Sequence, residues 1–217
     1  MFIMRVYKIL PLLVLIAFCC CGCTVELDVN ENESPSRTYI SDNGYSITVP
    51  QNWQENDISE STVEFCDEDN QLSLTITSEF GGVDYYSMRE IKDQLTETIA
   101  ADLFKTYDIT DDEGGTKYFH RVLKGADLQG AKLVVDIYAN QPFLTIRHYM
   151  VIVASSKAYK TYENQIDELI SSFTPTYTED EYLLLMEERR EAARNNESGE
   201  ADQTSGNTTE EQEPQEE

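Results

Sequence analysis

Gly44-Tyr45-Ser46-Ile47-Thr48-Val49-Pro50 is the segment most informative about the fold, and the only tryptophan follows it at position 53. Apolar and polar residues alternate from Tyr45 to Val49, which is the period of a strand with one buried face. The turn-forming residues 42–44 precede this strand, and Pro50 ends it. We therefore predict a strand over residues 45–49 whose three apolar side chains face a core, with Trp53 packed against its end.

After this strand, the sequence pattern predicts five further strands and two helices. The strands cover residues 63–65, 72–76, 116–123, 132–139 and 143–154, and the short polar segments between them favour antiparallel pairing. One helix begins at the capping box Ser87-Met88-Arg89-Glu90, and the other covers residues 158–173 and stops before Pro175. About six strands and two helices in this order predict an α+β domain over residues 38–177, with an antiparallel sheet packed between helices.

The order of these elements resembles the PsbP-like and DcrB-like group of domains. The features that carry the resemblance are the opening from Gly44 to Trp53, a hairpin, a helix, a long antiparallel run and a last helix ending in Ser172-Phe173. It covers roughly residues 39–175. The resemblance implies an αβα sandwich that serves protein contacts and assembly rather than catalysis.

The first residues have the layout of a signal peptide. Residues 1–8 carry two basic residues and no acidic one, and an apolar run of about ten residues follows, which is short of the roughly 20 that a spanning helix needs. Gly22-Cys23 resembles the lipobox of bacterial lipoproteins, so we expect removal of residues 1–22 and a lipid on Cys23. The open alternatives are lipidation of Cys20 or Cys21, ordinary secretion, and an uncleaved helical anchor. A lipid on Cys23 would place the chain on the extracytoplasmic face of the cell membrane.

The charge of the chain excludes one class of partner and indicates how a membrane is reached. With 41 acidic against 16 basic residues, the formal net charge is −25. No basic stripe exists to neutralise phosphates, so we expect no nucleic-acid binding. The same sign opposes direct adhesion to anionic lipid heads, so the covalent lipid is the expected link to the membrane.

Three segments outside the domain are polar or acidic. Residues 23–37 read as a flexible tether. Residues 178–195 predict an amphipathic helix opened by a capping box at Thr178, and residues 196–217 are expected to be a disordered acidic tail. The apolar residues of the predicted helix gather in one short stretch, which either folds back on the domain or contacts an envelope protein; the candidate contact residues are Tyr182, Leu183, Leu185 and Met186.

Candidate chemistry in the domain is sparse. His120 and His148, the only histidines, lie in predicted strands, and they form a metal site with Asp136 only if the strands align. Two acidic runs offer oxygen ligands for a cation such as Ca²⁺ but lack the calcium-loop pattern, and solvated turns explain both; the weak candidate ligands are Asp67, Asp69, Asp111 and Asp112. We expect Cys66 to pack as a small hydrophobic residue.

No phosphate-binding, nucleophile-elbow or zinc-protease motif is present. We therefore expect a non-enzymatic binding or assembly domain on a lipid anchor, without a cofactor, that contacts another envelope protein. The alternatives are a lipoprotein that binds a solute or metal ion and an enzyme of unrecognised type. A defined pocket lined by convergent polar groups would favour solute binding.

Overall fold

The structure is a computed structural model that describes residues 35–80 and 88–203. The chain divides into two compact units, with the boundary after Tyr177. The expected signal peptide and most of the expected tether lie outside the described residues, as do residues 81–87 and 204–217.

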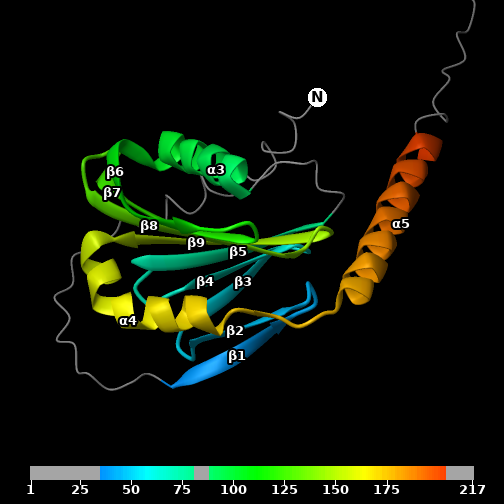
Figure 1. Cartoon of the computed structure of the whole chain (residues 1–217). Coiled ribbons are helices and arrows are strands. Elements are labelled where there is room, and N and C mark those ends of the chain that lie inside the picture. The colour runs from blue at the N-terminus through cyan, green and yellow to red at the C-terminus, as the bar shows by residue number, and fades with distance from the viewer. Residues whose placement is uncertain (1–34, 81–87, 204–217) are drawn as a thin grey trace, which may run out of the picture. The chain divides into compact units, whose positions relative to one another are not determined.

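The first unit is built on a seven-stranded antiparallel sheet (Figure 1). From one edge to the other, its strands are β3 (Gln54–Ser59), β4 (Thr62–Cys66), β5 (Leu72–Phe80), β9 (Ile146–Ser155), β8 (Lys132–Phe143), β7 (Tyr118–Asp127) and β6 (Phe104–Gly114). The chain leaves β5 in the middle of the sheet, passes through α3 (Met88–Leu103) to the far edge at β6, and returns strand by strand to β9. This crossover places α3 on one face of the sheet.

Alternate residues of the central strands face two separate cores. On the α3 side, Ile99 and Leu103 of the helix pack with odd-numbered residues of β7, β8 and β9 such as Val135 and Val153. On the other side, even-numbered residues such as Val134 and Ile152 pack beneath α4 (Ser156–Ser172). Figure 1 shows α3 and α4 on opposite sides of the large sheet.

A small sheet completes the layer that contains α4. It pairs β2 (Tyr45–Pro50) with β1 (Ser36–Ser41) on one side and with β10 (Thr174–Pro175) on the other, all antiparallel. The predicted buried face of β2 is confirmed, since Tyr45, Ile47 and Val49 are at most 1% exposed. The predicted α+β sandwich of sheet and helices is likewise confirmed.

Four strands were missing from the sequence prediction: β1, β3, β6 and β10. Strands β3 and β6 are almost wholly exposed, so they lack the alternation of apolar residues by which strands are recognised. The acidic residues of β6, which include Asp111 and Asp112, were interpreted as a solvated turn, and that interpretation was wrong. Backbone pairing with β7 holds them in a strand.

The second unit contains α5 (Glu179–Gln203). Its predicted capping box is confirmed: the Thr178 backbone N–H donates to Glu181 Oε2 at 2.7 Å, and the Glu181 N–H donates to Thr178 Oγ1 at 3.4 Å. The helix continues past residue 195, where the expected helix ended and the expected disordered tail began. Helical hydrogen bonds are local, so the lack of large apolar residues beyond position 195 does not by itself end the helix.

Gly125 permits the close approach of β6 to β7. A Cβ atom at this position would lie 2.7 Å from Tyr107 Cα and closer still to the Thr106 carbonyl oxygen, and both belong to the backbone of β6. We expect Gly125→Ala to lower the free energy of unfolding by about 1–3 kcal/mol, because the strand must move to admit the methyl group. Urea denaturation measures the change.

Gly115→Ala is the matched control for this prediction. A Cβ at Gly115 meets only the ring of Tyr118, at 3.3 Å, and that side chain is exposed and able to shift. If both variants unfold at the same urea concentration as the parent chain, the close approach of β6 to Gly125 is incorrect.

Candidate functional site

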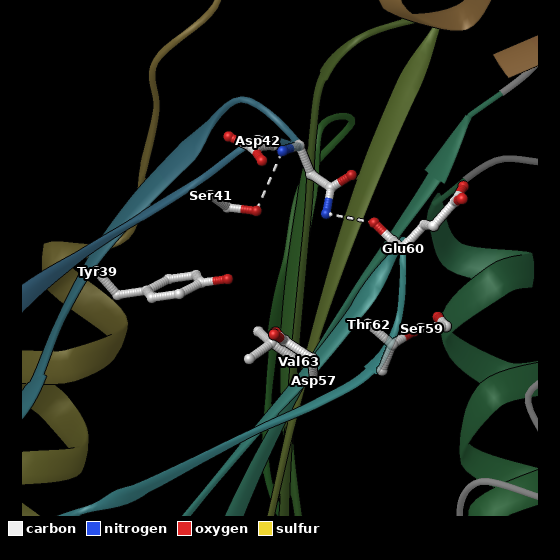
Figure 2. Close-up of a pocket in the computed structure, with 9 residues that line it drawn as sticks. Tyr39, Ser41, Asp42, Asp57, Ser59, Glu60, Thr62 and Val63 are labelled. Atoms are coloured by element: carbon white, nitrogen blue, oxygen red, sulfur yellow. Dashed lines mark hydrogen bonds between the residues drawn. The ribbon is translucent and has the colours of Figure 1, made fainter.

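A polar pocket of about 280 Å³ lies between the β1–β2 turn and the β3–β4 hairpin (Figure 2). The residues that line it include three acids, four residues with hydroxyl groups and an asparagine, and none is basic; they are Tyr39, Ser41, Asp42, Asn43, Asp57, Ser59, Glu60, Thr62 and Val63. The residues that line the pocket therefore carry a net negative charge. In Figure 2 the Glu60 side chain points away from Tyr39.

Local backbone chemistry builds this pocket. The turn closes with a hydrogen bond from the Gly44 N–H to the Ser41 carbonyl oxygen, and Gly44 has the positive φ of 79° that such a turn requires. The Asn43 N–H donates to Ser41 Oγ at 3.1 Å, and its Nδ2 donates to the Glu60 carbonyl oxygen at 3.1 Å (Figure 2). Asn43 thereby ties the turn to the β3–β4 hairpin.

Tyr39 supplies a protonated phenol to the same pocket. Burial raises the pKa of this phenol, a hydrogen bond with Ser41 lowers it, and the nearby carboxylates Glu55, Asp57 and Asp42 raise it again; the net effect is an increase. No sequence pattern marks this pocket. Its lining comes from two turns whose polar residues are individually typical of solvated loops.

His120, Asp136 and Tyr159 form a hydrogen-bonded cluster on the α4 side of the sheet. His120 Nε2 lies 2.6 Å from Asp136 Oδ1, and the Tyr159 hydroxyl donates to Asp136 Oδ2 at 2.8 Å. Asp136 is 1% exposed, so both of its oxygens have partners where water is excluded. The Asp136 hydrogen bond raises the pKa of His120 in spite of burial, and burial with the Asp136 charge raises the pKa of Tyr159.

His148 is separate from this cluster. It pairs with Asn140 in the β8–β9 register, whereas Asp136 pairs with Ile152. Its ring contacts Tyr45 and Phe173, with centroid distances of 5.2 and 5.3 Å, and Nδ1 lies 2.9 Å from Ser78 Oγ. Burial lowers the pKa of His148 to about 3, so the ring is neutral. The structure thus brings together two of the three residues considered for a metal site and leaves the third apart.

The acidic residues proposed as weak cation ligands have structural partners or lie apart. Asp67 Oδ1 accepts the N–H groups of Gln71 and Leu72 at 2.7 and 2.9 Å, which caps the turn between β4 and β5. Asp69 is an exposed residue of that turn, and Asp111 is exposed on β6. Asp112 forms salt bridges with Arg121 at 3.0 Å and Lys92 at 2.6 Å, and these cations lower its pKa.

Within the described residues, no group of three or more His, Cys, Asp and Glu side chains has an arrangement that could hold a metal ion. Cys66 is a buried free thiol, as expected. Cys23 lies outside the described residues. The expected partner-contact residues Tyr182, Leu183, Leu185 and Met186 lie in α5. Tyr182 and Met186 are buried, at 0% and 9% exposed, whereas Leu183 is 37% exposed.

The pKa values of the two histidines are shifted in opposite directions. Asp136 raises the pKa of His120. The folding stability that protonated His120 contributes is therefore complete below about pH 6.5 and is lost as the pH rises through the pKa of the folded state. His148 has a lowered pKa, so its contribution is complete above about pH 6.5 and declines as the pH falls toward 3. NMR titration of the ring protons should show a midpoint above about 6.5 for His120 and no titration of His148 near neutrality.

Asp136→Asn is expected to lower the His120 midpoint, because the amide carries no charge. Asp167→Asn, an exposed change on α4, is the control and should leave it near the parent value. An unchanged His120 midpoint in Asp136→Asn would refute the assigned pairing.

The sequence matches no family model and none of the curated proteins. Among solved structures, the domain is similar to the Ran-binding protein Mog1p of Saccharomyces cerevisiae, with 9% identity, a TM-score of 0.50, and coverage of 66% of this chain and 97% of that one. A point mutant of Mog1 gives 9% identity, a TM-score of 0.51, and coverage of 68% and 99%.

Cyanobacterial PsbP of Synechocystis is also similar, with 13% identity, a TM-score of 0.49, and coverage of 72% of this chain and 99% of that one. At 9% identity, the Mog1 likeness shows the fold alone. The first unit of this chain therefore has the Mog1/PsbP-like α+β fold, with a seven-stranded antiparallel sheet and a smaller sheet.

Proposed function

We propose that this chain is a bacterial lipoprotein whose domain binds another envelope protein without catalysing a reaction. A lipid on Cys23 holds it on the extracytoplasmic face of the cell membrane. The short tether after Cys23 gives the domain reach, and the acidic residues of the chain keep it from collapsing onto anionic lipid.

The sequence around Cys23 supports the anchor. Gly22-Cys23 follows an apolar run too short to span a bilayer, which is the arrangement of a lipoprotein signal. Among the described helices, none is long and apolar enough to cross a membrane. Two acyl chains on one cysteine hold a protein at a membrane where a single chain would be marginal.

The observation that carries the binding role is the fold. It is shared with Mog1p, which is described as a Ran-binding protein. The side chains best suited to catalysis in this domain are engaged within it: Asp136 bridges His120 and Tyr159, and His148, apart from them, is buried. These contacts connect layers of the fold, which supports a structural rather than a catalytic role.

The pocket between the β1–β2 turn and the β3–β4 hairpin favours a second candidate function, which is binding of a small cationic solute. Its volume of about 280 Å³ is near the lower end of small-molecule sites. Three acidic residues and no basic one line it, so an amine is the group that it would accept.

For the leading proposal, we expect Cys23→Ser to move the protein from the membrane to the soluble fraction and to abolish incorporation of labelled fatty acid. Amine-reactive cross-linking in intact cells should join the parent chain to a second envelope protein, and the released variant should lose that product. Fractionation, autoradiography and immunoblotting measure these outcomes.

Cys20→Ser and Cys21→Ser are the matched controls and should remain anchored. Loss of the lipid in either control but not in Cys23→Ser would move the lipidation site. Absence of any hetero-adduct from the anchored parent chain would argue against the binding role.

For the second candidate, calorimetric titration of the protein with spermidine should give saturable heat that Asp57→Asn combined with Glu60→Gln removes. Glu163→Gln combined with Glu168→Gln is the charge-matched control on the exposed side of α4. Equal heats from the two double variants would mean that spermidine responds only to net charge, and the pocket would then have no role.

A further inference from the structure

We infer that β6 is the docking edge of the proposed protein partner, and that it accepts an extended segment in which Lys or Arg alternates with apolar residues. The inference rests on the proposed binding function and names the surface and the chemistry that would carry it out. It depends on the free edge of the large sheet and on the division of the β6 side chains between two faces.

Strand β6 is a long edge. It spans 11 residues, all of them exposed except Phe104, and among the described strands it pairs only with β7. Half of its backbone donors and acceptors therefore face away from the sheet, which is the arrangement used when a partner adds a strand.

The opposite edge, β3, is shorter. It has six residues, and Arg37 of β1 forms a salt bridge of 2.7 Å with its Glu55. Of the two edges of the large sheet, β6 is therefore the one that offers the longer row of backbone groups to an added strand.

A β-bulge between Ile109 and Asp111 determines on which face of the sheet the side chains of β6 lie. Directly opposed residues of antiparallel strands share a face. Asp108 opposes Lys124, Asp111 opposes Val122, and Glu113 opposes His120. The even-numbered residues of β7 lie on the α4 side, and the register shift between Ile109 and Asp111 places all three acids on that side together.

The other face of β6 is apolar near its middle. Tyr107 opposes Gly125 and Ile109 opposes Leu123, which belongs to the core on the α3 side. Tyr107 and Ile109 are 40% and 47% exposed. An added strand would therefore place alternate side chains beside carboxylates and beside Tyr107 and Ile109.

The three acids on the α4 side remain available to an incoming cation. Among the described residues, none of Asp108, Asp111 and Glu113 is in an ion pair, whereas Asp112 on the opposite face binds Arg121 and Lys92. Lys124 is directed elsewhere, with its Nζ 5.7 Å from the centroid of the Tyr159 ring.

The same charges oppose pairing of β6 with a second copy of itself. In a two-fold antiparallel pair, the acidic faces of both copies would lie on the same side of the joined sheet. Like charges side by side are unfavourable there, so the fitting occupant is a basic segment of another protein.

The test uses the full chain in detergent and three fluorescent peptides. The first alternates Lys and Val over nine residues, the second has the same composition with all Lys before all Val, and the third is the first with alternate backbone nitrogens methylated. We expect the alternating peptide to bind tightest by anisotropy and to slow amide hydrogen exchange in β6. Methylation should abolish binding, because it removes the donors that pair with the edge.

Neutralising the acidic face with Asp108→Asn, Asp111→Asn and Glu113→Gln should weaken binding by roughly tenfold at low salt, since exposed ion pairs contribute little individually. Glu163→Gln, Asp167→Asn and Glu168→Gln on α4 remove the same charge and serve as the control. Equal losses in the two variants, binding that survives methylation, or self-association through β6 would each overturn the inference.

Photo-cross-linking in cells separates this inference from the proposed function. A photoreactive residue at Ile109 should capture an envelope protein, whereas one at Leu144, which is 73% exposed and distant in sequence, should not. Capture only from Leu144 would overturn the role of β6 and leave the binding function intact. Absence of capture from every position would count against both.

Discussion

Burial of β9 on both faces is the constraint on which the rest of the first unit depends. Every residue of this strand except Ser155 is buried, with alternate side chains in the two cores. A strand that is apolar on both sides is stable only when both faces are removed from water, at about 1.5–3 kcal/mol for each large side chain buried. The α3 crossover covers one face, and α4 with the small sheet covers the other. The three-layer architecture follows from this requirement.

Buried polar groups connect these layers. Asp136 joins the sheet to α4 through the Tyr159 hydroxyl, and Arg121 joins β7 to β6 and α3 through Asp112, Asp93 and Thr96. A buried charge without a partner costs several kcal/mol, so these side chains are tolerable only because their partners are in place. The residues that look most like catalytic groups in the sequence are therefore explained by the packing of the domain.

The acidic composition has different consequences at different places. Over the whole chain, a net charge of −25 opposes nucleic acids and anionic lipid surfaces. On β6, which among the described strands pairs only with β7, exposed acidic side chains oppose edge-to-edge association, which is a common use of charge at edge strands. Around the β1–β2 turn, three acidic residues and no basic one line a small pocket. Only the first of these effects is visible from composition.

Elements that bury an apolar face could be predicted from local sequence patterns. Tyr45, Ile47 and Val49 alternate, the apolar residues of α3 recur at helical spacing, and the Thr178 capping box marks the start of α5, because each pattern reports local geometry. The Mog1/PsbP-like fold could be expected from their order. The exposed strands β3 and β6 left no such pattern, since pairing with neighbours distant in sequence holds them in place. The pocket between two turns, the pairing of His120 with Asp136 but not with His148, and the acidic face of β6 depend on strand register. These features emerge only in the folded domain, because register arises from packing across the whole sheet rather than from any local segment of the chain.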